Sequence, residues 1–190
     1  MKRKWLFSLF LGLFCFVHSG YASGYGFSIT NAELLGSHKG YLFSADIDYR
    51  LSPRANDALL NGVPLTIVVK VQIDRYRKVM WNQKVFTKKI VYRVTYQSLR
   101  KSYRVYDHDL GRHQYFTDLH SALDTIGKIR GFIALDIEDV DLDAAYYAKV
   151  KVFLDIEALP LPLRSIAYLI PQWHISSGWY KWSLDLSNRQ

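Results

Sequence analysis

The sequence predicts a mainly β protein, an antiparallel β-sandwich of about seven to nine strands with two short helices; an α+β fold is the alternative. Long segments alternate apolar and polar residues, turn signals separate further short segments of the same kind, and few segments carry helix-start signals. A period of two places successive side chains on opposite faces of a strand, so we expect one buried and one wet face. That pattern favours antiparallel sheets.

The predicted strands fall into two groups by length. The long alternating segments are 41–51, 65–74, 90–97 and 146–157. The shorter candidates are 27–35, 99–106, 113–116 and 178–186. The polar segment 107–112, which contains Gly111, is expected to be the turn between two of them. In the last candidate, alternation places Trp182 in the core and Trp179 on the outside.

Two short helices interrupt the strand pattern. Ser52 followed by proline is typical of an N-cap and a first helical turn, and Gly62 is a typical C-terminal stop. The second helix is predicted to begin with Thr117 as its N-cap and to end at Gly127. Its apolar residues fall on one face at helical spacing, which predicts that it covers a sheet. These residues are Leu119, Ala122, Leu123 and Ile126.

The N-terminus has the three parts of a secretory signal peptide. Residues 2–4 are basic, 5–17 are uncharged and almost wholly apolar, and 20–22 offer small residues for cleavage. The apolar run is shorter than the roughly 20 residues that a helix needs to cross a bilayer. We therefore expect a signal peptide over 1–22 and a single exported domain over 23–190, with no transmembrane segment after cleavage.

Cleavage after Ala22 changes the composition of the folded protein. The removed segment holds Cys15, which is the one cysteine, and three of the 25 basic residues but none of the 17 acidic residues. The mature chain therefore has no cysteine and a formal net charge of 22 − 17 = +5. This excludes disulfides and a cysteine nucleophile, and the sequence has no GxSxG motif for a serine nucleophile. We expect no cofactor.

The positive charge of an exported domain indicates anionic partners other than nucleic acid. Envelope proteins, anionic lipids and surface glycans are the candidates, although a charge of this size also serves solubility. Basic and aromatic residues interleave along 84–106, and in a strand this places tyrosines inward and bases outward. The candidate ligand- or partner-binding residues are Lys89, Arg93, Arg100, Lys101, Arg104 and Trp179.

Histidines near the predicted hairpin are candidate metal ligands. His108 and His113 flank the turn, and cross-strand neighbours stand roughly 5 Å apart at their Cβ atoms, which permits a shared zinc ion. His120 lies on the second predicted helix, four residues before Asp124 and therefore on the same face. The alternative is that polar residues simply collect at turns and on solvated helix faces. No HExxH motif is present.

An acidic stretch over 136–143 also has two interpretations. Calcium prefers such carboxylate oxygens, but the glycine of the EF-hand loop is missing. Apolar residues alternate with the acids, as on an exposed edge strand whose charges block unwanted pairing. A carboxylate pair for glycoside hydrolysis stays open, because the separation of such a pair depends on the fold.

Several segments together resemble a family of exported proteobacterial proteins, domain of unknown function 4390. The segments are 58–65, 96–105, 116–123, 154–164 and 173–182. The resemblance implies a Gram-negative periplasmic location and a link to a membrane sensor kinase, and it carries no known activity or catalytic residues. The region after Arg75 holds fewer tryptophans than this family usually has there, with Trp81 alone.

The sequence therefore favours a non-enzymatic periplasmic binding or adaptor protein of the cell envelope. A glycan- or anionic-lipid-binding module is the first alternative, with Trp179 and the basic strand face as its contact residues. A metal-assisted envelope hydrolase that uses the three histidines is the second alternative.

Overall fold

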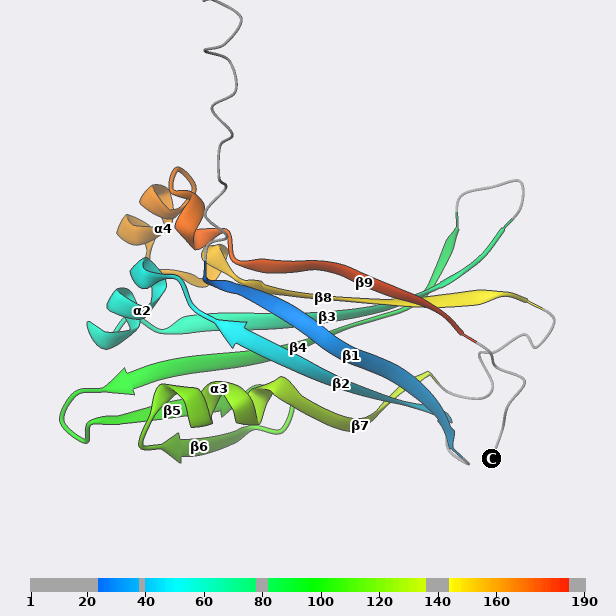
Figure 1. Ribbon diagram of the computed structural model, residues 1–190, viewed down its shortest axis with the longest axis horizontal. Coiled ribbons are helices and arrows are strands. Elements are labelled where there is room, and N and C mark those ends of the chain that lie inside the picture. Colours follow the sequence, from blue (N-terminus) through cyan, green and yellow to red (C-terminus); the bar gives the residue numbers. More distant parts are fainter. Residues whose placement is uncertain (1–23, 38–39, 78–81, 136–143, 185–190) are drawn as a thin grey trace, which may run out of the picture.

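The protein folds into long twisted strands with short helices gathered toward one end (Figure 1). The computed structural model describes residues 24–37, 40–77, 82–135 and 144–184. The strands are β1 (Gly26–Ser37), β2 (Gly40–Arg50), β3 (Leu65–Arg75), β4 (Gln83–Gln97), β5 (Ser102–Asp107), β6 (Arg112–Phe116), β7 (Lys128–Leu135), β8 (Tyr146–Leu154) and β9 (Ser176–Leu184). The helices are α2 (Pro53–Leu60), α3 (Leu119–Gly127) and α4 (Leu161–Ala167), with 3-10 turns η2 (Ile156–Ala158) and η3 (Pro171–Trp173).

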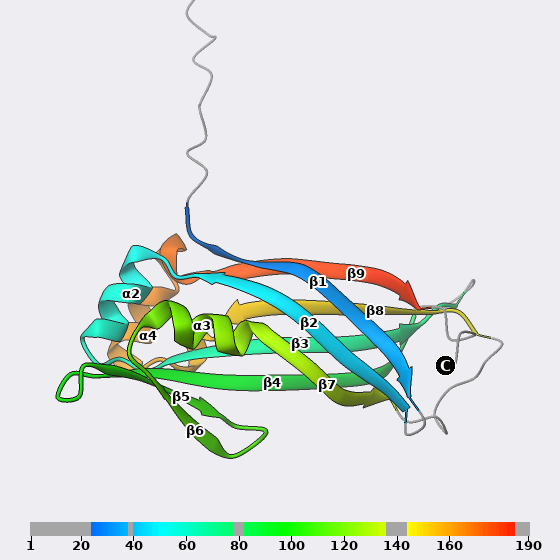
Figure 2. The same ribbon diagram turned by 60° about the horizontal axis from the view of Figure 1, so that its bottom comes forward.

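The strands form two antiparallel sheets that pack face to face. The smaller sheet has the order β1-β2-β7, and the larger six-stranded sheet has the order β6-β5-β4-β3-β8-β9. Strand β1 lies against β8 and β9 along one long edge of the sandwich (Figure 2). The core lies between the sheets, where Phe43 of β2 meets fully buried aliphatic residues of β3 and β8 such as Val69 and Val150. The prediction of a mainly β antiparallel sandwich is confirmed.

Strand β3 departs from the expected pattern of one buried and one wet face. Its inward residues are fully buried, but Thr66, Val68, Gln72 and Asp74 on its outward face are at most 5% exposed. The prediction of a wet face is wrong here because β3 is central in its sheet. Long side chains of β4, β8 and β9 flank it on both sides and cover its short outward groups.

The two predicted helices form, with one corrected boundary. The Ser52 side chain accepts the N–H of Ala55 at 3.2 Å and caps α2 as expected, and Gly62 follows with φ +83°. Helix α3 is capped by Asp118 rather than by the predicted Thr117. The Asp118 carboxylate accepts the N–H of Ser121 at 2.8 Å, and a charged acceptor suits a helix N-terminus better than a hydroxyl does.

Several elements differ from the sequence-based prediction. Strand β4 begins at Gln83 rather than at 90, and β5 begins at Ser102 rather than at 99. Strand β7 was not expected, because Gly131 with φ +61° interrupts its short apolar run. Helix α4 was not expected either, because two prolines mask a segment of about two turns, so a third helix joins the two predicted ones. Strand β8 ends at Leu154 rather than at 157, because the Asp155 side chain caps the turn η2.

Two predicted segments lie outside the described residues, namely the signal peptide over 1–22 and the acidic stretch over 136–143. Within the described part of the chain, no helix is long and apolar enough to cross a membrane.

Candidate functional site

The outward face of the six-stranded sheet gathers cations from five strands; we call it the outer basic face. Strand register places Lys70 opposite Lys89 on β4 and opposite Lys151 on β8, and it places Lys149 opposite Lys181. The cations of this face are Lys70, Lys84, Lys89, Arg93, Arg104, Lys149, Lys151 and Lys181. Among the described strand residues, Asp74 is the one carboxylate on this face. The face therefore carries a large excess of positive charge.

Asp74 is already neutralised within the sheet. Its carboxylate accepts Lys149 Nζ at 2.6 Å and Gln72 Nε2 at 2.7 Å, and its side chain is only 4% exposed. Burial alone would raise the Asp74 pKa, but hydrogen bonds from Lys149, Gln72 and Tyr147 and the charge of Lys149 together lower it. Asp74 stays ionised at neutral pH and compensates Lys149, and the other cations of the face remain available.

Trp179 lies on the outer basic face, as predicted, and is 40% exposed. The ammonium groups of Lys70 and Lys149 lie 5.8 and 5.2 Å from the centroid of its ring. A cation over an indole ring is attracted by the negative face of the ring. The Trp179 ring therefore positions two lysines of the face. Trp182 packs against the core, as predicted, and stacks on Phe43 with ring centroids 6.4 Å apart.

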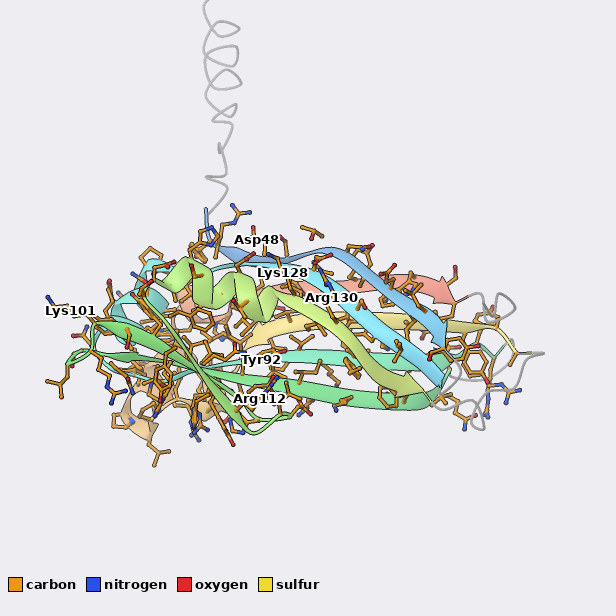
Figure 3. All side chains as sticks on the ribbon, turned by 90° about the horizontal axis from the view of Figure 1, so that it is seen from below. Asp48, Tyr92, Lys101, Arg112, Lys128 and Arg130 are labelled. Atoms are coloured by element: carbon orange, nitrogen blue, oxygen red, sulfur yellow. The ribbon has the colours of Figure 1, made fainter. Side chains whose placement is uncertain are left out.

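The predicted partner-binding residues divide between two places. Lys89, Arg93 and Arg104 lie together with Trp179 on the outer basic face. Arg100 and Lys101 lie in the exposed turn between β4 and β5. Figure 3 shows Lys101 at the end of the molecule, away from Arg112, Lys128 and Arg130.

The predicted metal ligands do not converge. Tyr106 contacts both hairpin histidines, with its ring centroid 4.6 Å from that of His108 and 4.5 Å from that of His113. His120 lies on α3 beside Asp48 and Asp124, in a separate shallow pocket at the outer side of the smaller sheet. Within the described ranges, no three His, Cys, Asp or Glu side chains are close enough to hold a metal ion.

The outward face of the three-stranded sheet differs in charge from the outer basic face. Arg50 pairs with Asp48 at 3.1 Å, and Arg130 pairs with Asp46 across two strands. Glu33 of β1 and Lys128 of β7 lie on the same face, which gives three acids and three bases among the described strand residues. Acids and bases here balance within the sheet, so this face presents no excess of either sign.

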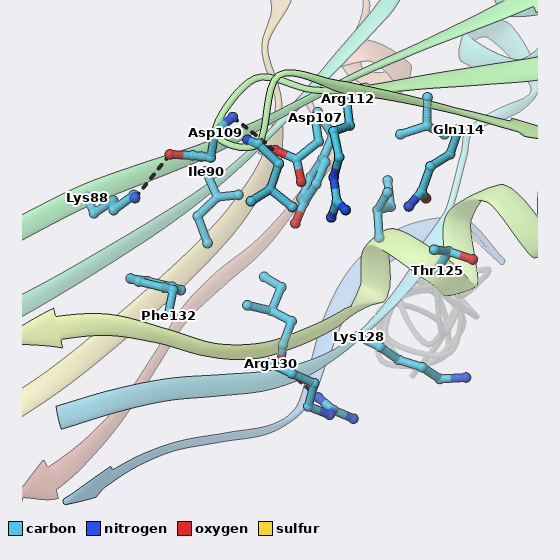
Figure 4. Close-up of a pocket in the computed structure, with 15 residues that line it drawn as sticks. Lys88, Ile90, Asp107, Asp109, Arg112, Gln114, Thr125, Lys128, Arg130 and Phe132 are labelled. Atoms are coloured by element: carbon cyan, nitrogen blue, oxygen red, sulfur yellow. Dashed lines mark hydrogen bonds and ion pairs between the residues drawn. The ribbon is translucent and has the colours of Figure 1, made fainter. Parts of the chain in front are cut away.

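A groove between β4, β5, β6 and β7, beside α3, is a recess that the sequence did not predict (Figure 4). Its floor is apolar and its rim is charged. The groove unites residues that are distant in sequence, and no motif marks it. The missed cations of the outer basic face are Lys70, Lys84, Lys149, Lys151 and Lys181. Their alternation with apolar residues in β3, β4, β8 and β9 is the signal that could have placed most of them outward.

These features define an antiparallel β-sandwich with one strongly basic sheet face and an open groove, and with no cluster of three metal-ligating side chains among the described residues. The chain belongs to the family described as Domain of unknown function (DUF4390), whose model matches residues 25–183. No curated protein and no solved structure matches the chain.

Proposed function

We propose that this chain is a non-enzymatic binding protein of the bacterial cell envelope, which contacts an acidic partner protein through the outer basic face. The excess of cations on that face carries the proposal. An open sheet face with four exposed cations, four half-buried cations and one buried carboxylate is complementary to an acidic surface. The signal-like N-terminus and the family's exported character support a periplasmic setting.

The form of the face favours a protein over a glycan. Sugar recognition uses open aromatic faces, whereas Lys70 and Lys149 lie over the ring of Trp179. The twist of the long strands, visible in Figure 1, makes the face less suited to a flat lipid surface than to a shaped protein surface. The family's link to a membrane sensor kinase makes an acidic periplasmic kinase domain the first partner to test.

Site-specific photo-crosslinking of the full chain in living cells tests this proposal. A photoreactive residue replaces Thr87, which is exposed on the outer basic face, or Ser28, which is exposed on the outward face of the smaller sheet. We expect one discrete protein adduct from position 87 and none from position 28, and mass spectrometry identifies the adduct.

Charge reversal then distinguishes binding from mere proximity. Lys89→Glu with Arg93→Glu is expected to abolish the adduct, because two attractive charges become repulsive. Arg50→Glu on the other sheet is the matched control and is expected to leave the adduct intact. No adduct at position 87, or an adduct that survives the double reversal, would contradict the proposal. Reversal-sensitive binding of the purified protein to anionic vesicles, without any protein adduct, would assign the face to lipid instead.

A further inference from the structure

The two long edges of the sandwich are built differently. At one edge β1 packs against β8 and β9, and Trp182 stacks on Phe43 in the core behind them. At the other edge the β5–β6 hairpin stands apart from β7, and a groove of about 340 Å³ lies between them. This volume falls within the range of roughly 300–1,000 Å³ that small-molecule sites occupy.

The floor of the groove is apolar and contributed by four elements. Ile90 and Tyr92 of β4, Val105 of β5, Ile126 of α3 and Ile129 of β7 line it, and each is at most 9% exposed. The half-buried ring of Phe132 closes one end. A floor of this kind stabilises an apolar ligand by removing its surface from water.

The polar rim leaves one cation without a carboxylate partner. Lys88 pairs with Asp109 at 3.1 Å, Lys128 pairs with Asp124 at 2.7 Å, and Arg130 pairs with Asp46. Arg112 also lines the groove, and in the described part of the chain it forms no ion pair. Figure 4 shows its side chain extending from β6 into the groove.

The remaining polar groups favour an anion at Arg112. Asp107 lies opposite Arg112 in register but forms no ion pair with it; its Oδ1 accepts the N–H groups of Asp109 and Leu110 in the turn at 2.9 and 3.0 Å. Burial, followed by the charges of Asp107 and Asp109, raises the Tyr92 pKa, so the phenol stays protonated and can donate a hydrogen bond. Gln114 adds a neutral amide to the same rim.

From this arrangement we infer that the groove binds a single-chain anionic amphiphile, a fatty-acid carboxylate. The acyl chain lies on the apolar floor toward Phe132, and the carboxylate pairs with the guanidinium of Arg112. An arginine fork matches a carboxylate in geometry as well as in charge.

An added peptide strand fits this edge less well. The Arg130 guanidinium donates to the carbonyl oxygens of Ala45 and Ile129, and the register of β7 against β2 is irregular at this point. Gly131 there has φ +61°. Irregular pairing and an edge arginine are devices that discourage strand addition, whereas they leave the floor open to an acyl chain.

Calorimetric titration of the purified mature domain with three twelve-carbon amphiphiles tests the inference. Dodecanoate, dodecyl maltoside and dodecyltrimethylammonium share the tail and differ in the charge of the head, and all are kept below their micelle-forming concentrations. We expect saturable one-site binding of dodecanoate, weaker binding of the maltoside and none of the cation. Binding of all three with equal affinity, or of none, would overturn the inference.

Substitutions of two exposed arginines distinguish recognition of the carboxylate head group at Arg112 from general attraction of an anion to a basic protein. Arg112→Gln is expected to weaken dodecanoate binding about tenfold, which corresponds to loss of a charge-assisted hydrogen bond. The same variant is expected to leave maltoside binding unchanged. Arg54→Gln, an exposed cation on α2, is the matched control and is expected to change neither.

Dodecanoate binding in the groove is expected to be independent of the outer basic face, which is proposed to bind the partner protein. Lys89→Glu with Arg93→Glu, on the other face of the sheet, is expected to retain dodecanoate binding. Equal affinity of Arg112→Gln and wild type for dodecanoate would refute the carboxylate site. Saturable binding of an extended acidic peptide without any dodecanoate binding would assign the groove to strand addition.

Discussion

The outward faces of the two sheets differ in how far their charged side chains are compensated by neighbouring charges. On the three-stranded sheet, Asp46 and Asp48 each pair with an arginine, and the face is close to neutral. On the outward face of the six-stranded sheet, Asp74 is the one carboxylate among the described strand residues; it is buried and hydrogen-bonded, and lysines and arginines surround it. The charges of the first face compensate one another, whereas the second face carries uncompensated positive charge that a partner can neutralise.

The ion pairs of the two faces also differ in burial: the pair on the six-stranded sheet is buried, and the pair on the three-stranded sheet is exposed. The side chains of Asp74 and Lys149 are 4% and 17% exposed, but those of Arg50 and Asp48 are 62% and 50% exposed. A buried pair holds the structure around it, because removal of one partner leaves a charge without solvent. An exposed pair keeps its water and contributes little. The comparison therefore predicts effects of different size at chemically similar sites.

The largest expected effect comes from the core that both sheets share. Phe43 of the smaller sheet is fully buried and contacts the rings of Phe132 and Trp182. Phe43→Ala is expected to lower the free energy of unfolding by about 4 kcal/mol, measured by urea denaturation. Leu35→Ala, at a position 55% exposed, is the control and should change stability by less than about 0.5 kcal/mol. Similar values for both would mean that the two sheets do not share one core.

The next effect separates the two faces directly. Asp74→Ala leaves the ammonium of Lys149 and the amide of Gln72 without their acceptor, and we expect a loss of about 3 kcal/mol. Asp48→Ala, on the exposed pair, is expected to cost less than about 1 kcal/mol. The same denaturation experiment compares both variants. Equal losses would remove the distinction between a buried and an exposed ion pair.

A smaller effect appears as a dependence of stability on pH. The folded-state pKa of Asp74 lies below its ordinary value, so its ionised form stabilises the fold at neutral pH. This contribution is fully present above the unfolded pKa of about 3.9, and it is lost as the pH falls through the folded pKa. Asp74→Asn cannot titrate, and its stability should fall less between pH 5 and pH 2 than that of the wild type. Parallel pH curves for the two proteins would argue against a lowered pKa.

Alternation of side chains made most of the large sheet and part of its basic face predictable. Lys89 and Arg93 are four residues apart in one strand, so a period of two alone places them on one side. The meeting of Lys70 with Lys151 was not predictable, because β3 and β8 are distant in sequence and local patterns do not encode such pairing. The double burial of β3 follows from the same long-range pairing.

The groove shows the limit of sequence reasoning more sharply. Arg112 follows Gly111 in a polar turn, where an arginine is unremarkable. Its significance comes from the ion pairs that its neighbours form and Arg112 does not, and those depend on three-dimensional contacts. The placement of the predicted histidine ligands was not predictable for a related reason, because the Tyr106 ring contacts both His108 and His113 while His120 lies in a separate pocket.

The smallest effect completes the comparison of the faces. A double-mutant cycle on Arg50 and Asp48, with each replaced by alanine, should give a coupling energy of about 0.5 kcal/mol, because both side chains are more exposed than buried. Raising the salt concentration to about 1 M shortens the Debye length to roughly 3 Å and should reduce this coupling further. The corresponding cycle on Asp74 and Lys149 should give a larger coupling that salt changes little, because solvent ions do not reach a carboxylate that is 4% exposed. Equal weakening of both pairs by salt would mean that solvent ions reach Asp74. The outer basic face could then no longer be described as a set of available cations around a buried carboxylate.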